Sequence, residues 1–253
     1  MNGITFYACG NTPAIQNTVE RLKKLGITVT DTPDPSVTHL MLPVPSFDRN
    51  GNIQGGGALS DILLQLPKSI TIIGGNLPSD QLDGYSVIDL LKDARYLAEN
   101  AAITADCAVS VARQKLPTVW HSCPVLILGW GRIGKCLSHL LQQLGADVTV
   151  AARKEADIAM LRGLGYGAED IRKLHYGLMR YRVIFNTVPE MVLTPEQTSH
   201  CRADCLLIEL ASKPGIEGQN VISALGLPGK LAPESSGKLI AASVIRLILG
   251  REC

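Results

Sequence analysis

The sequence predicts an α/β protein with two doubly wound parallel sheets, one in each of two domains. Short β-branched or apolar runs alternate with helical patterns along the chain, which is typical of βαβ units. The alternation pauses at a long alanine-rich helical segment and restarts beyond Pro117, which indicates two domains. The chain has 253 residues, of which 46% are hydrophobic, enough for two modest cores.

Residues 1–93 are expected to form the first, flavodoxin-like domain on the substrate side. The runs predicted as strands are GITFYA, ITVTD, THLMLPVP, SITIIGG and YSVIDLL, at residues 3–8, 27–31, 38–45, 69–75 and 85–91. The last of these runs also fits a turn of helix. Helical patterns cover residues 13–26, where Gly26 closes the helix, and residues 57–67.

The alanine-rich segment 94–118 is expected to be a helix between the domains, with Thr104 as a candidate N-cap. The second domain is then expected at residues 119–229. Its predicted strands are CPVLILG, ADVTVAA, RVIFNTVP, CLLIELAS and NVISALGLPG, at residues 123–129, 146–152, 182–189, 205–212 and 220–229. A last helix in residues 230–253 is expected to return and pack on the first domain.

Composition narrows the classes of partner. The net charge is +1 and no dense Lys/Arg block occurs, so nothing indicates a nucleic-acid or membrane-surface partner. No apolar run approaches the roughly 18 residues of a membrane span, and the start of the chain lacks a basic leader, so we expect a cytoplasmic protein. Cys201 and Cys205 beside His200 form the main cysteine cluster, but too few ligands converge for a metal site.

A glycine motif opens the second domain. Gly129, Gly131 and Gly134 form G-x-G-x-x-G directly after a predicted strand and before a predicted helix, the context that a Rossmann dinucleotide site requires. The first glycine permits a tight turn, the second lets a pyrophosphate approach the backbone, and the third brings helix and strand together. The intervening Trp130, Arg132 and Ile133 belong to the same predicted site. A purely structural glycine turn is the alternative.

The end of the next strand bears on the choice of cofactor. Arg153 and Lys154 stand where an acid would bind the ribose of NAD, and a guanidinium there favours the phosphorylated ribose of NADP. NAD remains open, since two solvated surface cations explain the same residues. Asn186, Thr187 and Pro189 follow a later strand at the edge where such sheets bind ligands, and are candidates for the nicotinamide ribose.

Five stretches in order resemble the family of dipicolinate synthase A subunits: LGWGRIG, LGADVTVAARK, FNTVPEMVL, ELASKPG and LGLPGKLAPESSGKLIA. The resemblance implies an oligomeric sporulation enzyme that transfers hydride from dihydrodipicolinate to NADP, with a flavoprotein-like B subunit as partner. The architecture is also similar to that of D-2-hydroxyacid dehydrogenases. The acid–base histidine of those enzymes is missing from APESSGK, which argues against hydroxyacid oxidation.

The substrate implied by the resemblance carries two carboxylates, so cations and helix-end donors are expected around it. Lys213 is the first candidate, both as a catalytic and as a substrate-binding residue. Ser235 and Ser236 are candidates for a carboxylate at the start of the last helix, although a plain N-cap explains them as well. Thr104 is a further substrate-binding candidate. Asp106, which stands where the family's pattern has a glutamate, is the candidate proton acceptor.

Two other functions stay open at this point. The alternatives are a dehydrogenase of another small acid and a non-catalytic subunit that only binds the cofactor.

Overall fold

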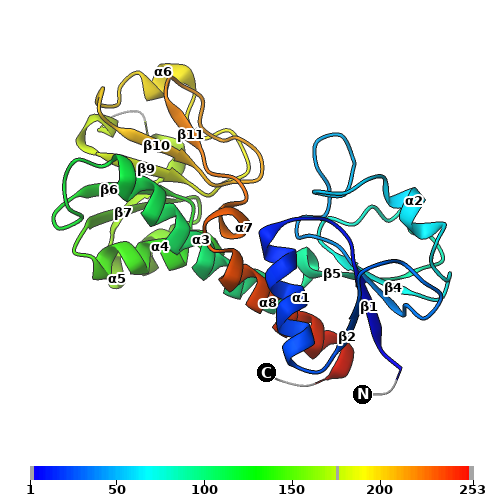
Figure 1. The fold of residues 1–253 in the computed structure, drawn as a ribbon. Helices are drawn as coiled ribbons and strands as arrows, with labels where there is room; N and C mark the ends of the chain where they lie inside the picture. Colours follow the sequence, from blue (N-terminus) through cyan, green and yellow to red (C-terminus); the bar gives the residue numbers. More distant parts are fainter. Residues whose placement is uncertain (1–2, 175–176, 251–253) are drawn as a thin grey trace. The chain divides into compact units, whose positions relative to one another are not determined.

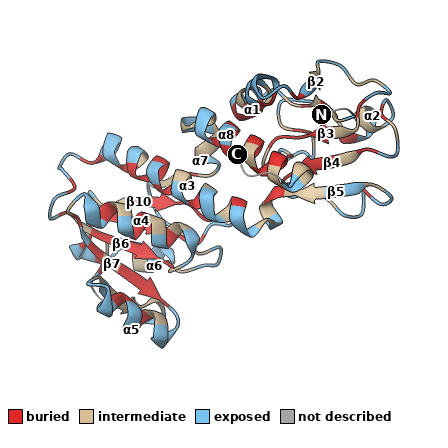
Figure 2. Cartoon of the chain, turned by 90° about the horizontal axis from the view of Figure 1, so that it is seen from below, coloured by how far each residue is buried: buried red, intermediate tan, exposed pale blue. Residues whose placement is uncertain are grey.

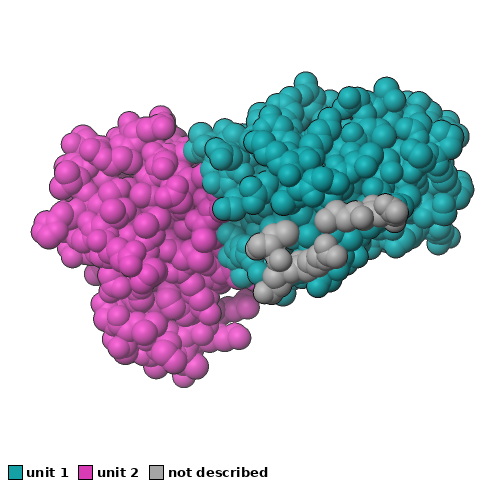
Figure 3. Space-filling view, turned by 60° about the horizontal axis from the view of Figure 1, so that its bottom comes forward, with its two compact units in different colours: residues 1–100, 228–253 teal, residues 101–227 magenta. Residues whose placement is uncertain are grey.

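The computed structural model describes residues 3–174 and 177–250 and divides into two compact units. Unit 1 comprises residues 1–100 together with 228–253, and unit 2 comprises residues 101–227 (Figure 3). Each unit contains one parallel sheet with helices packed on it (Figure 1). The predicted fold class, two α/β domains with doubly wound parallel sheets, is confirmed.

Unit 1 is built on a five-stranded sheet with the strand order β2-β1-β3-β4-β5. This is the order of the flavodoxin type, with all neighbours parallel. The strands are β1 (Thr5–Ala8), β2 (Thr28–Thr30), β3 (His39–Met41), β4 (Thr71–Gly74) and β5 (Ser86–Asp89). The central strands place Phe6, Leu40, Met41, Ile72 and Ile73 in the core, as expected for a sheet covered on both faces.

Helices α1 (Pro13–Lys24) and α8 (Pro233–Leu249) pack against each other in unit 1, so the two ends of the chain share one core. α1 begins where the Thr12 hydroxyl accepts a hydrogen bond from the Ile15 amide at 3.3 Å. The Thr18 hydroxyl, inside the interface, donates to the Ala14 carbonyl and lies 3.3 Å from the Gly237 carbonyl. Gly237 allows this approach, since a Cβ there would lie 2.5 Å from that of Asn17.

The helix predicted at residues 57–67 is much shorter in the structure. α2 covers only Leu59–Leu63, and no side chain caps it at Ala58. Leu64, directly after the helix, is 86% exposed, whereas Leu59, Ile62 and Leu63 pack on the core of unit 1. After β5, the 3-10 helix η1 (Leu90–Lys92) ends the β-rich part of unit 1.

Helix α3 (Ala94–Lys115) begins earlier than a cap at Thr104 would place it. The Asp93 carboxylate accepts from the Tyr96 amide at 2.7 Å, which caps the helix at its true start. Thr104 lies inside the helix and is buried, so its expected capping role is wrong. The alanine-rich sequence continues the helix through this position because alanine is the best helix former. Its first residues belong to unit 1 and those from Ala101 onward to unit 2.

Unit 2 is a six-stranded parallel sheet in the order β11-β10-β9-β6-β7-β8. The strands are β6 (Pro124–Leu128), β7 (Asp147–Ala152), β8 (Gly167–Asp170), β9 (Val183–Asn186), β10 (Leu206–Glu209) and β11 (Val221–Ser223). This is the 3-2-1-4-5-6 order of the Rossmann fold, whose direction of winding reverses between β6 and β9. The residues of β6 and β9 are almost all buried, and Figure 2 shows this for β6.

Besides the part of α3 from Ala101 onward, unit 2 contains the helices α4 (Arg132–Gln143), α5 (Glu155–Gly163) and α6 (Pro195–Thr198), with 3-10 turns η2 (Ile171–Lys173) and η3 (Leu178–Arg180). α7 (Leu227–Leu231) crosses the boundary between the units. The edge strand β8 was absent from the sequence prediction because its residues, Gly-Ala-Glu-Asp, lack both alternation and β-branched side chains. Among the described residues, no helix is long and apolar enough to cross a membrane.

Candidate functional site

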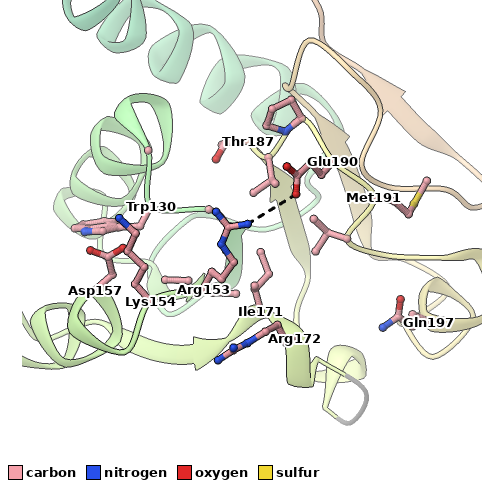
Figure 4. Close-up of a pocket in the computed structure, with 17 residues that line it drawn as sticks. Trp130, Arg153, Lys154, Asp157, Ile171, Arg172, Thr187, Glu190, Met191 and Gln197 are labelled. Carbon is pink, nitrogen blue, oxygen red and sulfur yellow. Dashed lines mark ion pairs between the residues drawn. The ribbon is translucent and has the colours of Figure 1, made fainter.

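A cavity of about 540 Å³ opens in unit 2 at the carboxyl ends of its central strands (Figure 4). This is the edge where the strand order reverses, the usual ligand position in such sheets. Four segments supply most of its lining: the glycine turn after β6, the end of β7, the turn η2, and residues 187–192 after β9. Asp157 of α5 and Gln197 of α6 complete it.

The three glycines of the motif meet different surroundings. Gly129 has a φ of +102°, and a Cβ on it would lie 2.6 Å from the Thr187 hydroxyl. A Cβ on Gly134 would overlap the Gly129 carbonyl oxygen, so helix α4 lies against the turn. A Cβ on Gly131 would meet no protein atom within 4 Å. The turn is therefore tightly packed behind Gly129 and Gly134 and open in front of Gly131.

The remaining residues of the motif lie at the start of α4. Gly131 is the N-cap of that helix and makes no side-chain cap, which leaves the first backbone N–H groups of α4 available. Arg132 is exposed and Ile133 half-buried in the first turn, outside the cavity lining. Trp130 lines the cavity and packs edge-on against Tyr166, with ring centroids 5.8 Å apart.

Three cations line the cavity near the ends of β7 and β8. Arg153 and Lys154 directly follow β7, and Arg172 lies in η2. The Arg153 guanidinium extends toward Glu190, 4.0 Å away, and its side chain is 70% exposed (Figure 4). Arg172 binds the Asp170 carboxylate through two hydrogen bonds of 2.8 and 2.7 Å, which hold the pKa of Asp170 down at about 2.

Sequence reasoning missed Arg172 together with the acidic residues Asp157 and Glu190. β8 was not predicted, so no signal placed Arg172 near Arg153. Asp157 occupies the first turn of α5 and Glu190 the segment after β9. The periodicity of α5 identifies the first turn, but only the fold shows that it faces the cavity.

The three residues predicted after β9 have different positions. Thr187 and Pro189 line the cavity, and the Thr187 hydroxyl donates to the Leu128 carbonyl at 2.8 Å. Asn186 is fully buried behind them. Its amide nitrogen donates to the Val188 carbonyl and to the Glu209 carboxylate, and its oxygen accepts from the Val188 amide. Asn186 therefore shapes the wall of the cavity from behind, where a ribose contact was expected.

The candidate substrate and catalytic residues lie in both units. In unit 2, Lys213 is exposed in the turn after β10, while α3 carries buried Thr104 and exposed Asp106. In unit 1, Ser235 is exposed and Ser236 buried near the start of α8. The N-cap of α8 is Ala232, so the alternative that these serines cap the helix is wrong. Within the described residues, the Ser236 hydroxyl has no hydrogen-bond partner.

The cysteine cluster is a pair of neighbouring thiols. A hydrogen bond from the Cys205 thiol lowers the pKa of Cys201, while the same contact and burial raise that of Cys205. In the described parts of the chain, no group of three or more His, Cys, Asp or Glu residues is arranged to hold a metal ion.

Comparison with known proteins gives a sequence relative and several similar structures. No protein-family model matches the chain. The A subunit of dipicolinate synthase from Bacillus subtilis (strain 168) is 29% identical over 157 residues, which is 59% of this chain and 53% of that protein. The match thus spans about half of the length of the curated relative. The resemblance to this family that the five motifs predicted is confirmed.

Two solved structures illustrate the fold. The A subunit of dipicolinate synthase from Bacillus halodurans superimposes with a TM-score of 0.85 at 21% identity, covering 97% of each chain. A D-lactate dehydrogenase from Salmonella gives a TM-score of 0.63 at 13% identity, covering 98% of this chain and 97% of its own. At these identities the likeness establishes the two-domain fold.

Proposed function

We propose that this chain is a nicotinamide-nucleotide-dependent oxidoreductase of the type of the dipicolinate synthase A subunits. The proposed reaction transfers hydride from dihydrodipicolinate to NADP and yields dipicolinate. The observation that carries the proposal is the cavity at the strand-order reversal of unit 2, with a glycine turn that is open in front of Gly131. The similarity to a dipicolinate synthase A subunit and to a dehydrogenase fold supports an oxidoreductase.

The residues of the cavity suit a dinucleotide. The open space in front of Gly131 would admit a pyrophosphate, and the free N–H groups of α4 would donate to its oxygens. The positive end of the α4 dipole favours the anion further. Thr187 and Pro189 form the wall beyond β9, where the nicotinamide half would lie. When bound, the nicotinamide ring supplies the hydride acceptor of the reaction.

Charge supports NADP over NAD. Arg153, Lys154 and Arg172 surround the end of the cavity where the adenosine ribose of a Rossmann-bound dinucleotide lies. An additional phosphate on that ribose carries up to two negative charges, which guanidinium groups bind through charge-assisted hydrogen bonds. Glu190 already faces Arg153 and is the acid that the phosphate would displace.

We assign the substrate to the remaining predicted residues. Lys213 is the cation for a substrate carboxylate, and Thr104, Ser235 and Ser236 are hydroxyl donors to the same class of group. Oxidation of the dihydropyridine ring removes a hydride from one carbon and a proton from its neighbour. Asp106 is the proposed acceptor of that proton, and formation of the aromatic ring drives the loss of both.

The proposed partners are a flavoprotein-like B subunit and further copies of this chain. The deciding experiment mixes the purified chain, its flavoprotein-like partner, dihydrodipicolinate and NADP, and follows the absorbance band of the reduced cofactor. Growth of that band supports the proposal, and its absence contradicts it. Turnover of a different small acid would instead indicate a related dehydrogenase. Tight NADPH binding without turnover of any acid would indicate a non-catalytic subunit.

A further inference from the structure

Glu209, the last residue of β10, is a buried carboxylate surrounded by amide donors. Only 3% of its surface is exposed. Its Oε1 accepts from the Asn186 side-chain amide at 2.9 Å and from the Ala211 backbone amide at 2.8 Å. Its Oε2 accepts from the same Asn186 nitrogen at 3.0 Å, and from the backbone amides of Gly215 and Ile216 at 2.7 and 3.1 Å.

These contacts require both oxygens to act as acceptors, the role of an ionised carboxylate. Burying a charge without hydrogen-bond donors costs free energy, so the amides stabilise the buried carboxylate. The carboxylate in turn holds these amides in place. The backbone donors come from both ends of the turn 210–216, which also carries Lys213. Glu209 therefore fixes the shape of this turn.

The same turn supports the wall of the cavity. The Gly215 carbonyl accepts from the Val192 and Leu193 amides at 2.8 and 3.0 Å. Gly215 packs so closely that a Cβ there would overlap the Glu190 carbonyl oxygen and lie 2.8 Å from that of Val188. Asn186 links the carboxylate to the wall directly, since its amide nitrogen binds both Glu209 and the Val188 carbonyl. Every residue from 187 to 192 lines the cavity.

We propose that Glu209 is a positioning residue of the nucleotide site, whose buried carboxylate fixes the cavity wall at residues 187–192 and the turn that carries Lys213. The inference rests on the proposed function for the identity of the ligand. The wall follows β9, on the side of the cavity assigned to the nicotinamide half. Arg153 and Lys154 follow β7, on the side assigned to the adenosine half. Of the wall residues, Glu190 extends an exposed side chain toward Arg153, but Glu209 acts on the backbone of the wall and therefore chiefly on the nicotinamide half of the dinucleotide.

The variant Glu209→Gln tests this inference because it keeps the volume and removes the charge. The glutamine NH₂ group is a donor, so it cannot accept from the amides that face one carboxylate oxygen. We expect the affinity for NADPH, followed through Trp130 fluorescence, to fall at least tenfold. The affinity for adenosine 2′,5′-bisphosphate, which lacks the nicotinamide half, should change less than twofold. Glu217→Gln, an exposed change in the same segment, should leave both affinities unchanged.

A second variant, Glu209→Asp, keeps the buried charge and both acceptor oxygens on a shorter side chain. It should retain more NADPH affinity than Glu209→Gln. If Glu209→Gln does not fold, Glu209→Asp is compared with the unaltered chain using the same two ligands, and selective loss of NADPH affinity supports the inference. The inference would be overturned if a folded variant kept its affinity for both ligands, or lost affinity for both by the same factor. Failure of the unaltered chain to bind NADPH would instead contradict the proposed function.

Discussion

The glycine motif combines two requirements, space for a ligand at Gly131 and close packing of α4 at Gly134. A Cβ on Gly131 would meet open space, and its φ of −83° suits any residue. A Cβ on Gly134 would overlap the Gly129 carbonyl oxygen, which is backbone and cannot move aside cheaply. The first position therefore concerns the ligand and the second the packing of α4.

We accordingly predict opposite effects for two alanine variants. Gly131→Ala should leave the melting temperature unchanged but weaken NADPH binding at least tenfold, about 1.4 kcal/mol, because its methyl group occupies the space for the pyrophosphate. Gly134→Ala should lower the free energy of unfolding by about 1–3 kcal/mol through overpacking. Thermal denaturation and Trp130 fluorescence titration measure the two quantities. Unchanged NADPH affinity in Gly131→Ala would contradict this account of the site.

A second prediction at the residue scale concerns the choice of cofactor. Arg153→Asp should abolish the preference for NADPH over NADH, because the charge-assisted bonds it removes are worth about 1.5–3 kcal/mol each. That corresponds to roughly ten- to a hundredfold in relative affinity. The matched control is Arg162→Asp, an exposed change at the far end of α5. If titration with both nucleotides shows the preference intact, Arg153 does not select the cofactor.

The sequence identifies candidate site residues where the signal is local. The glycine turn and the cations after β7 each lie within one short stretch of the chain, so neither depends on knowing the tertiary structure. Arg172 and Glu209 were not predicted. Each reaches the site through the packing of its strand in the sheet, and the sequence of that strand gives no sign of a site. Asn186 shows a different limit: it ends β9, as the sequence indicated, but its side chain turns inward and donates to Glu209.

Whether an element could be predicted depended on whether its own residues carry a signal. Central strands such as β6 and β9 are continuous apolar runs, so their existence was evident. The edge strand β8 is stabilised by pairing with β7 along one side, and its polar sequence gave no indication. The start of α3 depends on the Asp93 cap, and Thr104 was a competing candidate because threonine also caps helices, although less well than aspartate.

Strand β3 carries a histidine whose environment makes unit 1 sensitive to pH. His39 stacks on Phe6, with ring centroids 5.0 Å apart, and burial lowers its pKa below the ordinary value of 6.5. Below about pH 6.5 the unfolded chain therefore binds more protons at this residue than the folded chain does. Its contribution to stability is complete above that pH and is lost as the pH falls toward the lowered pKa.

We predict that unit 1 unfolds at progressively lower temperature as the pH is reduced from about 7 to 5. His39→Gln removes the titrating group and should flatten that dependence. His139→Gln, an exposed change in α4 of unit 2, is the control. Calorimetric scans at several pH values measure the effect, and an unaltered slope in His39→Gln would assign the pH dependence to other groups.

At the scale of the whole molecule, the two units differ in how the chain supplies them. Unit 2 is continuous, and every residue lining its cavity lies within residues 101–227. Unit 1 needs residues from both ends, because α8 covers the buried face of α1. Buried Ala14, Ile15, Thr18 and Leu22 lie on that helix.

A chain shortened to residues 1–227 should therefore lose the ordered structure of unit 1 and keep its affinity for NADPH. The loss follows from exposing the face of α1 that α8 covers, and the retained affinity follows from an intact cavity. Limited proteolysis should cleave residues 1–100 of the shortened chain rapidly, and bound NADPH should protect unit 2 by stabilising its folded state. Loss of nucleotide binding on truncation would show that unit 2 depends on α8.

The return of α8 also sets the order in which the protein is completed during synthesis. Domains generally fold as units while the chain emerges from the ribosome, N-terminal parts first. Here the N-terminal unit has to wait for the segment translated after unit 2, so the nucleotide-binding fold is finished before the unit that precedes it. Throughout that interval the nascent polypeptide exposes the apolar face of α1 that α8 later covers, and such a surface is a natural target for chaperones.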